Sequence, residues 1–192
     1  MKGPGKGEYG YIRAQLKREA LKASLCFLIS FALLFTGMII AKYRNPDISW
    51  SKSRNNLLTV AAVLGILPGT RFLIQAIMFA KAKKTACPEE LFLRCKETGA
   101  ALLYDLFFTE YKINHPVYAM AVNDNEVFGL GCGEVSKCEE HLREVLKKDG
   151  HKNVTVKLFT DEDKFLDRLQ NDRGKRTERA DALMSSVLSV SL

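Results

Sequence analysis

The stretch Gly65–Lys84, GILPGTRFLIQAIMFAKAKK, decides what kind of protein this sequence encodes. It is apolar enough to enter a membrane, yet it contains Pro68, Gly69 and Arg71, which a lipid-buried helix rarely carries together. The choice lies between a membrane span and a piece of a soluble core. The 24 residues from Leu57 to Ala80 contain Arg71 as their one charge, so we predict a tilted span with a kink near Pro68.

Pro68, Gly69 and Arg71 together form a polar break inside this predicted span. An arginine at the bilayer centre costs about 2.5–3.5 kcal/mol on insertion scales, and less toward an interface. In one interpretation, which we favour, Arg71 extends toward the headgroups along its apolar stem. In the other, it pairs with a carboxylate of a partner or with a lipid phosphate, and the break is then an assembly site.

A first span precedes this stretch. Residues 23–41, ASLCFLISFALLFTGMIIA, contain no charge and are bounded by Lys22 and Lys42. At a rise of about 1.5 Å per residue they cover about 28 Å, close to the thickness of a bilayer core. The run is long for a cleaved signal peptide and begins 22 residues into the chain, so we predict a retained anchor.

The two spans form a hairpin in this interpretation. Its link contains the turn signal Asn45-Pro46 and two predicted interfacial anchors, Tyr43 and Trp50. The link carries 4 Lys/Arg, whereas residues 1–22 and 81–84 together carry 9. This bias predicts an integral membrane protein with both termini in the cytoplasm, in the plasma membrane if the source is bacterial.

The charge distribution indicates which partners to expect. The chain of 192 residues has a net charge of +7, but residues 1–84 carry +11 and residues 85–192 carry −4. The basic juxtamembrane segment 1–22 is therefore expected to contact the bilayer and its anionic headgroups. A mildly acidic domain is not expected to bind nucleic acid. The five cysteines follow no disulfide pattern and are expected to be reduced.

The hydrophobic patterns divide the chain into the basic segment 1–22, a hairpin at 23–84 with spans of about 23–41 and 57–80, and a soluble domain at 85–192. The class is α+β, with about four strands and three to four helices in the cytosolic domain. Its predicted elements are a helix at 88–97, strands at 101–109, 117–122 and 126–131, a helix from Ser136 to Gly150, a strand at 154–160, and helices at 161–170 and in the tail.

Two local patterns refine this prediction. Ser136 and Glu139 match a capping box at a helix start. The tail predicts an amphipathic helix whose apolar stripe consists of Ala180, Leu183, Met184, Val187 and Leu188.

Cysteine and histidine residues offer the nearest approach to a catalytic or metal centre. Cys132, Cys138 and His141 lie close in sequence, and His115 or Cys95 would complete a set of zinc ligands. The spacing departs from the usual CxxC pairs, so thiols that fill the core are the favoured interpretation. A Cys–His nucleophile built from the same residues is the other alternative. We assign no catalytic, cofactor-binding or metal-binding residue.

Two further features have structural interpretations. GLGCG, residues 129–133, follows a strand and precedes a helix, as a phosphate loop does, but it lacks the P-loop lysine. A tight bend is the favoured interpretation. Asp105 lies inside an apolar strand and is expected to face water; buried, it would need a partner and would form a site with Glu110.

The order helix, three strands, helix, strand is similar to the core of restriction-endonuclease-like metal nucleases. That resemblance implies an acid on the second strand and E-x-K on the third. Asp124 and Glu134-x-x-Lys137 only approach this pattern, because the spacing is one residue too long and Lys137 falls at a helix start. The likeness is therefore one of element order.

The leading functional prediction is a membrane-anchored protein whose cytosolic domain acts by interaction or regulation, as a component of a membrane complex. A protein partner or a second copy of the chain would then complete the assembly. The alternatives are a membrane-tethered hydrolase that depends on a metal or a cysteine, and a small transport component that uses Arg71.

Overall fold

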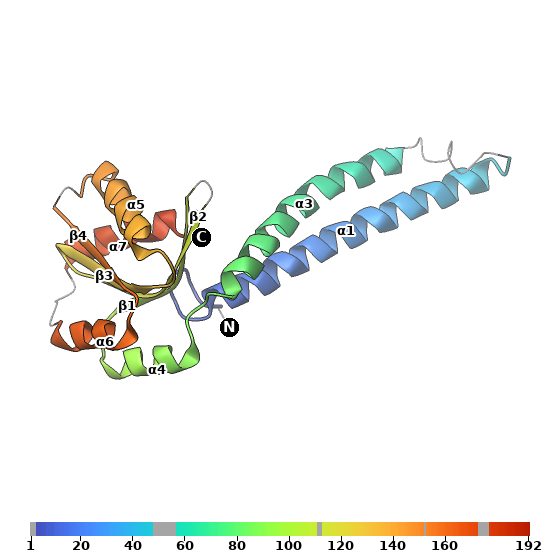
Figure 1. Ribbon diagram of the computed structural model, residues 1–192. Coiled ribbons are helices and arrows are strands. Elements are labelled where there is room, and N and C mark those ends of the chain that lie inside the picture. The colour runs from blue at the N-terminus through green and yellow to red at the C-terminus, as the bar shows by residue number, and fades with distance from the viewer. Residues whose placement is uncertain (1–2, 48–56, 111–112, 152, 173–176) are drawn as a thin grey trace. The chain divides into compact units, whose positions relative to one another are not determined.

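The computed structural model describes residues 3–47, 57–110, 113–151, 153–172 and 177–192 (Figure 1). These residues form a mixed α+β structure with six helices and one four-stranded sheet, which confirms the predicted class. The elements are α1 (Tyr11–Arg44), α3 (Leu57–Lys83), α4 (Glu89–Glu97), β1 (Leu102–Glu110), β2 (Ile113–Val122), β3 (Glu126–Gly131), α5 (Val135–Lys148), β4 (Thr155–Phe159), α6 (Glu162–Asn171) and α7 (Glu178–Val190).

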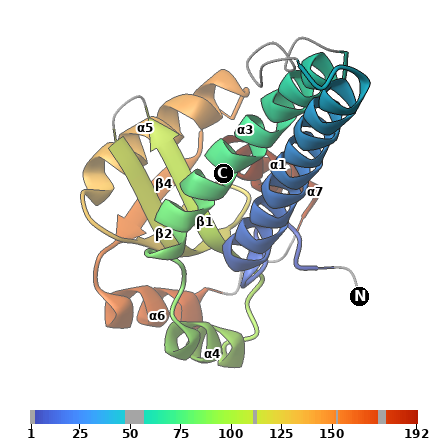
Figure 2. The same cartoon turned by 90° about the vertical axis from the view of Figure 1, so that its right-hand side faces the viewer.

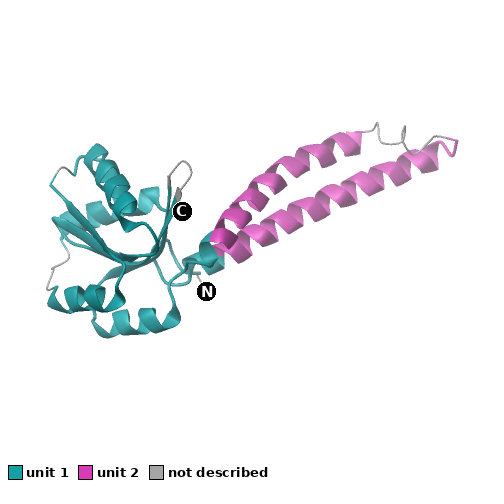
Figure 3. Cartoon of the chain, in the orientation of Figure 1, with its two compact units in different colours: residues 1–14, 82–192 teal, residues 15–81 magenta. Residues whose placement is uncertain are grey.

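The chain divides into two compact units, which Figure 3 shows in different colours. One unit contains residues 1–14 and 82–192, and the other contains residues 15–81. The predicted boundaries lay at 22 and 84. The difference arises at the N-terminus, where the carbonyl of Gly7 accepts a hydrogen bond of 2.8 Å from the Tyr104 amide of β1. The first residues thus belong to the sheet domain.

The sheet has the strand order β1-β2-β3-β4. The first three strands form an antiparallel meander, and β4 pairs parallel to β3 after the crossover through α5. The predicted hairpin turn is confirmed, since the Asn123 amide donates to the Glu126 carbonyl at 2.8 Å. β2 is longer than predicted, since it begins at Ile113 and not at residue 117.

Helices cover both faces of the sheet (Figures 1 and 2). α5 and α7 pack on one face, and α4 and α6 pack on the other. Alternation along the strands divides the apolar side chains between two cores, as the pleat requires. The predicted stripe of α7 is confirmed: Ala180, Leu183 and Val187 are buried, and Met184 and Leu188 pack against the first core.

The free edge of β1 is covered by both ends of the chain. The Gly7 carbonyl pairs with Tyr104, and the Leu192 amide donates to the Phe107 carbonyl at 2.9 Å. Lys6 Nζ donates to the Ser191 carbonyl at 2.6 Å, so the two ends are also joined to each other. Covered edges do not recruit strands from other molecules.

The other edge, along β4, is covered by side chains of α5. Glu139 Oε1 accepts a hydrogen bond of 2.6 Å from the Leu158 amide, and the Arg143 guanidinium donates to the Val156 carbonyl at 3.4 Å. The predicted capping box is therefore wrong, because Glu139 satisfies a strand amide instead. α5 begins after Glu134, which makes no side-chain cap.

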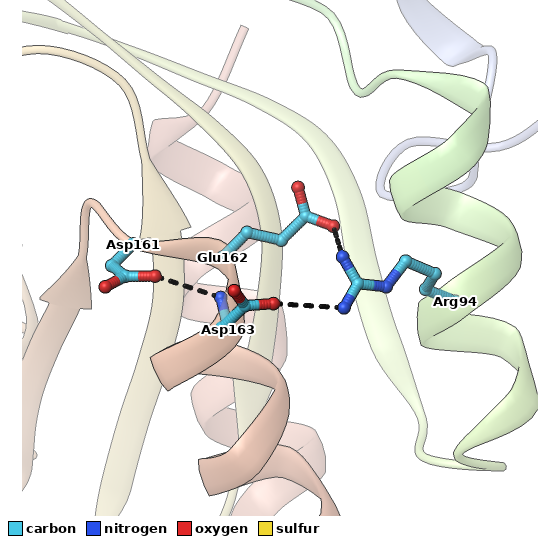
Figure 4. Close-up of polar contacts among 4 residues, drawn as sticks. All are labelled: Arg94, Asp161, Glu162 and Asp163. Carbon is cyan, nitrogen blue, oxygen red and sulfur yellow. Dashed lines mark hydrogen bonds and ion pairs between the residues drawn. The ribbon is translucent and has the colours of Figure 1, made fainter.

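α4 and α6 are joined at the surface by Arg94 (Figure 4). Its guanidinium pairs with Glu162 and lies 3.1 Å from the Asp163 carboxylate. Asp161 caps α6 by accepting from the Asp163 amide at 3.1 Å. Because these groups are exposed, water screens the charges and the contribution to stability is small.

The second unit consists of α1 and α3, which are both long and apolar enough to span a membrane. They pack antiparallel: a Cβ at Gly65 would lie 2.5 Å from Ser30 Oγ, and one at Gly69 would lie 3.3 Å from Cys26 Cβ. Seam positions alternate steps of three and four residues, the spacing of left-handed helix pairs. They are Leu16, Glu19, Ala23, Cys26, Ser30, Leu33 and Gly37 on α1, and Ala62, Gly65, Gly69, Phe72, Ala76 and Phe79 on α3.

Candidate functional site

Asp105, a residue of β1, has a buried carboxylate that lies beside the first residues of α1. It is 4% exposed, so the expectation that it faces water is wrong. Its Oδ2 accepts a hydrogen bond of 2.8 Å from the Gly10 amide, and its Oδ1 accepts one of 2.9 Å from the Cys87 amide. The Ile12 amide is a further donor. The suggested site with Glu110 stays untested, because the Glu110 side chain lies outside the described part of the structure.

The backbone of Asp105 is adapted to this role. Its φ of 54° lies in the left-handed region, which Asp and Asn enter more readily than most residues. The β1–β2 register has no pair at this position, since Tyr104 pairs with Ala119 and Leu106 with Val117. Asp105 is thus turned out of the ladder to meet the amides.

Burial and hydrogen bonding act on the Asp105 carboxyl in opposite directions. Desolvation raises its pKa above the ordinary value, and the amides of Cys87 and Gly10 and the Arg13 charge act to lower it. Desolvation is the largest of these effects, so the pKa is raised overall, although the amides and the dipole at the N-terminus of α1 favour the charged form.

The segments that Asp105 holds are the two connections of the helix pair. Gly10 and Ile12 lead into α1, and Cys87 follows α3. One carboxylate of β1 therefore fixes the chain on its way into the helix pair and on its way out. Tyr9 adds a stacked contact with Phe92 of α4, at 4.1 Å between ring centroids.

The buried thiols are inert parts of the core. Cys87 and Cys95 are 0% exposed, and Cys138 is 2% exposed. Burial raises the pKa of Cys87 to about 12 and that of Cys95 to about 11, so both remain protonated near neutral pH. All five cysteines are free in this structure. Of the two cysteines of the suggested metal set, Cys138 fills the core as favoured from the sequence, whereas Cys132 is exposed and does not.

The structure brings some of the suggested zinc ligands together and separates others. His115 and His141 face each other with ring centroids 6.5 Å apart, and His141 Nε2 is buried without a hydrogen-bond partner. Cys138 belongs to the same core, but Cys95 lies in the core on the opposite face of the sheet. Within the described residues, no three His, Cys, Asp or Glu side chains are placed to hold one metal ion.

Cys132 is exposed at the end of β3 and makes a different contact. Its thiol and the hydroxyl of Tyr118 are hydrogen-bonded, and this contact, with burial, raises the pKa of Tyr118 to about 12. Tyr118 lies at the irregularity of the β2–β3 register between Val117 and Ala119. The structure thus pairs Cys132 with a tyrosine instead of a histidine.

The nuclease-like acids lie at opposite ends of β3. Asp124 is in the β2–β3 turn and accepts a hydrogen bond from Thr177, whereas Glu134 precedes α5 and pairs with Lys137. The six residues of β3 stand between them, a length of about 20 Å at about 3.3 Å per residue. The structure therefore does not assemble these groups into one site.

The glycine-rich stretch after β3 is a tight bend, as favoured from the sequence. Gly133 has a φ of 92°, and a Cβ at Gly131 would lie 2.9 Å from Val135 Cγ1. Both positions need glycine for the turn from strand to helix, so packing explains them without a phosphate.

The residues of the predicted polar break have different roles in the helix pair. α3 remains helical through Pro68, and the side chains of Pro68 and Arg71 are exposed. Gly69 is buried on the seam against Cys26 and Phe27. The spacing Gly65-x3-Gly69 is the sequence signal for such close helix packing. Of the predicted anchors, Tyr43 is 90% exposed, and Trp50 lies outside the described residues.

Glu19 is a functional candidate that the sequence analysis missed. It is 7% exposed on the seam of α1, its Oε1 lies 2.6 Å from Lys22 Nζ, and its Oε2 is buried without a hydrogen-bond partner. The signal was present, because Glu19 falls in step with Cys26 and Leu33 at intervals of seven residues.

Comparisons of the chain with protein-family models, with curated proteins and with solved structures find no match.

Proposed function

We propose that α1 and α3 are inserted in a membrane as a two-span hairpin. The observation that carries this proposal is the distribution of exposed apolar side chains. Of the nineteen large hydrophobic side chains that are exposed among the described residues, eighteen lie between Leu21 and Met78, and the other is Leu93. A water-soluble unit rarely exposes such a surface, whereas a lipid environment requires it.

The charges on either side of the hairpin support an orientation with both termini in the cytoplasm. Nine Lys/Arg in residues 1–22 and 81–84 stand against four in the link. Tyr43, at the end of α1, fits an anchor at the far interface. The α+β domain would then lie on the cytoplasmic side, where free thiols are kept reduced.

We propose that this domain acts by interaction or regulation within a membrane complex. Asp105 supports the proposal, because it binds the amides on both connections of the hairpin to β1. Asp105 thus fixes the two chain segments that connect the hairpin to the sheet domain. Both edges of the sheet are covered, so association by strand addition is disfavoured and the helices remain as the surface for assembly.

Membrane fractionation tests insertion. The full-length protein should stay in the membrane fraction after alkaline carbonate extraction and should enter solution only with detergent. Release by carbonate alone would overturn the assignment of the hairpin.

Assembly is tested on detergent-solubilised membranes. The wild-type chain should migrate in a particle larger than a monomer with its detergent. Asp105→Ala should shift it toward the monomer, and Glu140→Ala, which removes an exposed carboxylate, should not. A wild-type monomer would contradict the assignment to a complex.

A further inference from the structure

The register of the helix pair places Arg71 at the end of the uncharged run of α1. The uncharged run 23–41 is bounded at its N-terminal end by Lys22. Lys22 Nζ lies 5.3 Å from the centroid of the Phe72 ring. The contacts of Gly69 with Cys26 and of Gly65 with Ser30 continue the same antiparallel register. Arg71, which precedes Phe72, is therefore level with Lys22 and not with the middle of the run.

The two basic residues also lie on the same side of the pair. Each precedes a seam residue by one position, Lys22 before Ala23 and Arg71 before Phe72. In an antiparallel pair of right-handed helices, positions one residue before the seam flank it on the same side. Arg18 lies one turn from Lys22 on that side.

The balance of charge at this level is positive. Glu19 is the one acid there among the described residues, and it is buried and paired with Lys22. At this level the pair carries three cations, Arg18, Lys22 and Arg71, and one carboxylate, so the local net charge is +2. Arg71 is exposed, and it makes no hydrogen bond or ion pair with any described residue.

We propose that Arg71 and Lys22 bind the phosphate of one anionic lipid at the cytoplasmic boundary of the bilayer. This inference rests on the proposed insertion of the hairpin. The planar guanidinium binds two phosphate oxygens at once, and the ammonium adds a point charge. Glu19 accepts from Lys22 and so holds the ammonium beside Phe72. Binding at the boundary explains why a span carries Arg71 at low insertion cost.

Native mass spectrometry of the full-length protein in detergent tests the proposal. The protein is titrated with phosphatidylglycerol and, separately, with phosphatidylcholine. The wild type should bind phosphatidylglycerol about tenfold more tightly, because a charge-assisted contact contributes roughly that factor. Arg71→Gln should remove most of this preference, Lys22→Gln should weaken it, and Arg71→Lys should keep part of it.

The matched control is Lys81→Gln, which removes the same charge about 15 Å further along α3 and should leave the preference unchanged. An unchanged preference in Arg71→Gln, or an equal loss in Lys81→Gln, would overturn the site. Displacement of phosphatidylglycerol by inorganic phosphate would overturn the assignment to a lipid. Carbonate extraction of each variant separates these outcomes from a failure of insertion, because loss of a charge should leave the hairpin in the membrane.

Discussion

The carboxylate of Asp105 lies 2.9 Å from the backbone amide of Cys87, 18 residues earlier in the chain. Through this contact and the one to Gly10, a single side chain of β1 holds both connections of the helix pair. The arrangement makes the domain and the first residues of the chain one structural unit.

Removal of the Asp105 carboxylate should loosen both connections. Asp105→Ala leaves the buried Cys87 amide and the partly buried Gly10 amide without this acceptor, and an unsatisfied buried group costs about 1–3 kcal/mol. Hydrogen exchange of the full-length protein in detergent should show faster exchange in peptides around Gly10 and Cys87. Glu140→Ala serves as the control, and equal protection in both variants would contradict the role of Asp105.

The ionisation of Asp105 should make stability depend on pH. Its raised pKa means that the folded state holds the proton more tightly than the unfolded chain does. Its contribution to stability is therefore full below the ordinary pKa of 3.8 and declines as the pH rises through the raised value. Relative to Asp105→Asn, the thermal stability of the wild type should fall over this range. Thermal stability is measured by near-ultraviolet circular dichroism. A rise in the stability of the wild type relative to Asp105→Asn over this range would contradict the raised pKa.

Native reactivity should distinguish the cysteines. Cys132 is exposed and should react with a maleimide within minutes at neutral pH, whereas Cys87 and Cys95 should react only after unfolding. Burial and pKa values of about 12 and about 11 both suppress their thiolates. Peptide mass spectrometry after labelling reads this pattern directly. Fast modification of Cys87 in the native protein would show that the core is open.

The register of the helix pair can be tested by a disulfide. A Cβ at position 69 lies 3.3 Å from Cys26 Cβ, close to the separation of about 3.5–4.5 Å in disulfides. Gly69→Cys should therefore form an intramolecular cross-link to Cys26 on mild oxidation. Thr70→Cys, which is exposed on the next position of α3, should not. Equal cross-linking from both positions would contradict the register.

The edge of β4 offers a comparison between two residues of α5. Glu139→Ala leaves the Leu158 amide without its acceptor and should lower stability by about 1–3 kcal/mol. Ser136→Ala should change it by less than about 0.5 kcal/mol, because the capping box does not form. The pair is compared by thermal unfolding. A larger loss of stability in Ser136→Ala than in Glu139→Ala would show that the capping box does form.

The sequence predicted the elements with clear periodicity and missed those that depend on distant partners. The alternation in VTVKLFT and the stripe around Leu183 were sufficient for β4 and α7, because each pattern lies within one element. The burial of Asp105 was not predictable, since its donors are 95 and 18 residues away. Glu139 was misread for the same reason: its acceptor role depends on the placement of Leu158.

The candidate sites follow the same division. The spacing Gly65-x3-Gly69 lies within one segment and would have marked the helix seam, but the sequence analysis did not use it. The level of Arg71 depends on where the other helix lies. Only the register with Lys22 places Arg71 beside the end of the uncharged run. The suggested ligands Cys95 and Cys138 are separated because they fall on opposite faces of the sheet.

The central claim is a membrane hairpin with the domain in the cytoplasm, and labelling in intact cells tests it most directly. The protein carries Ser51→Cys in the link and retains Cys132, the exposed thiol of the domain. A membrane-impermeant maleimide should label position 51 in intact cells and should label Cys132 only after the membrane is opened. Labelling of Cys132 in intact cells, with position 51 protected, would contradict the orientation and with it the account.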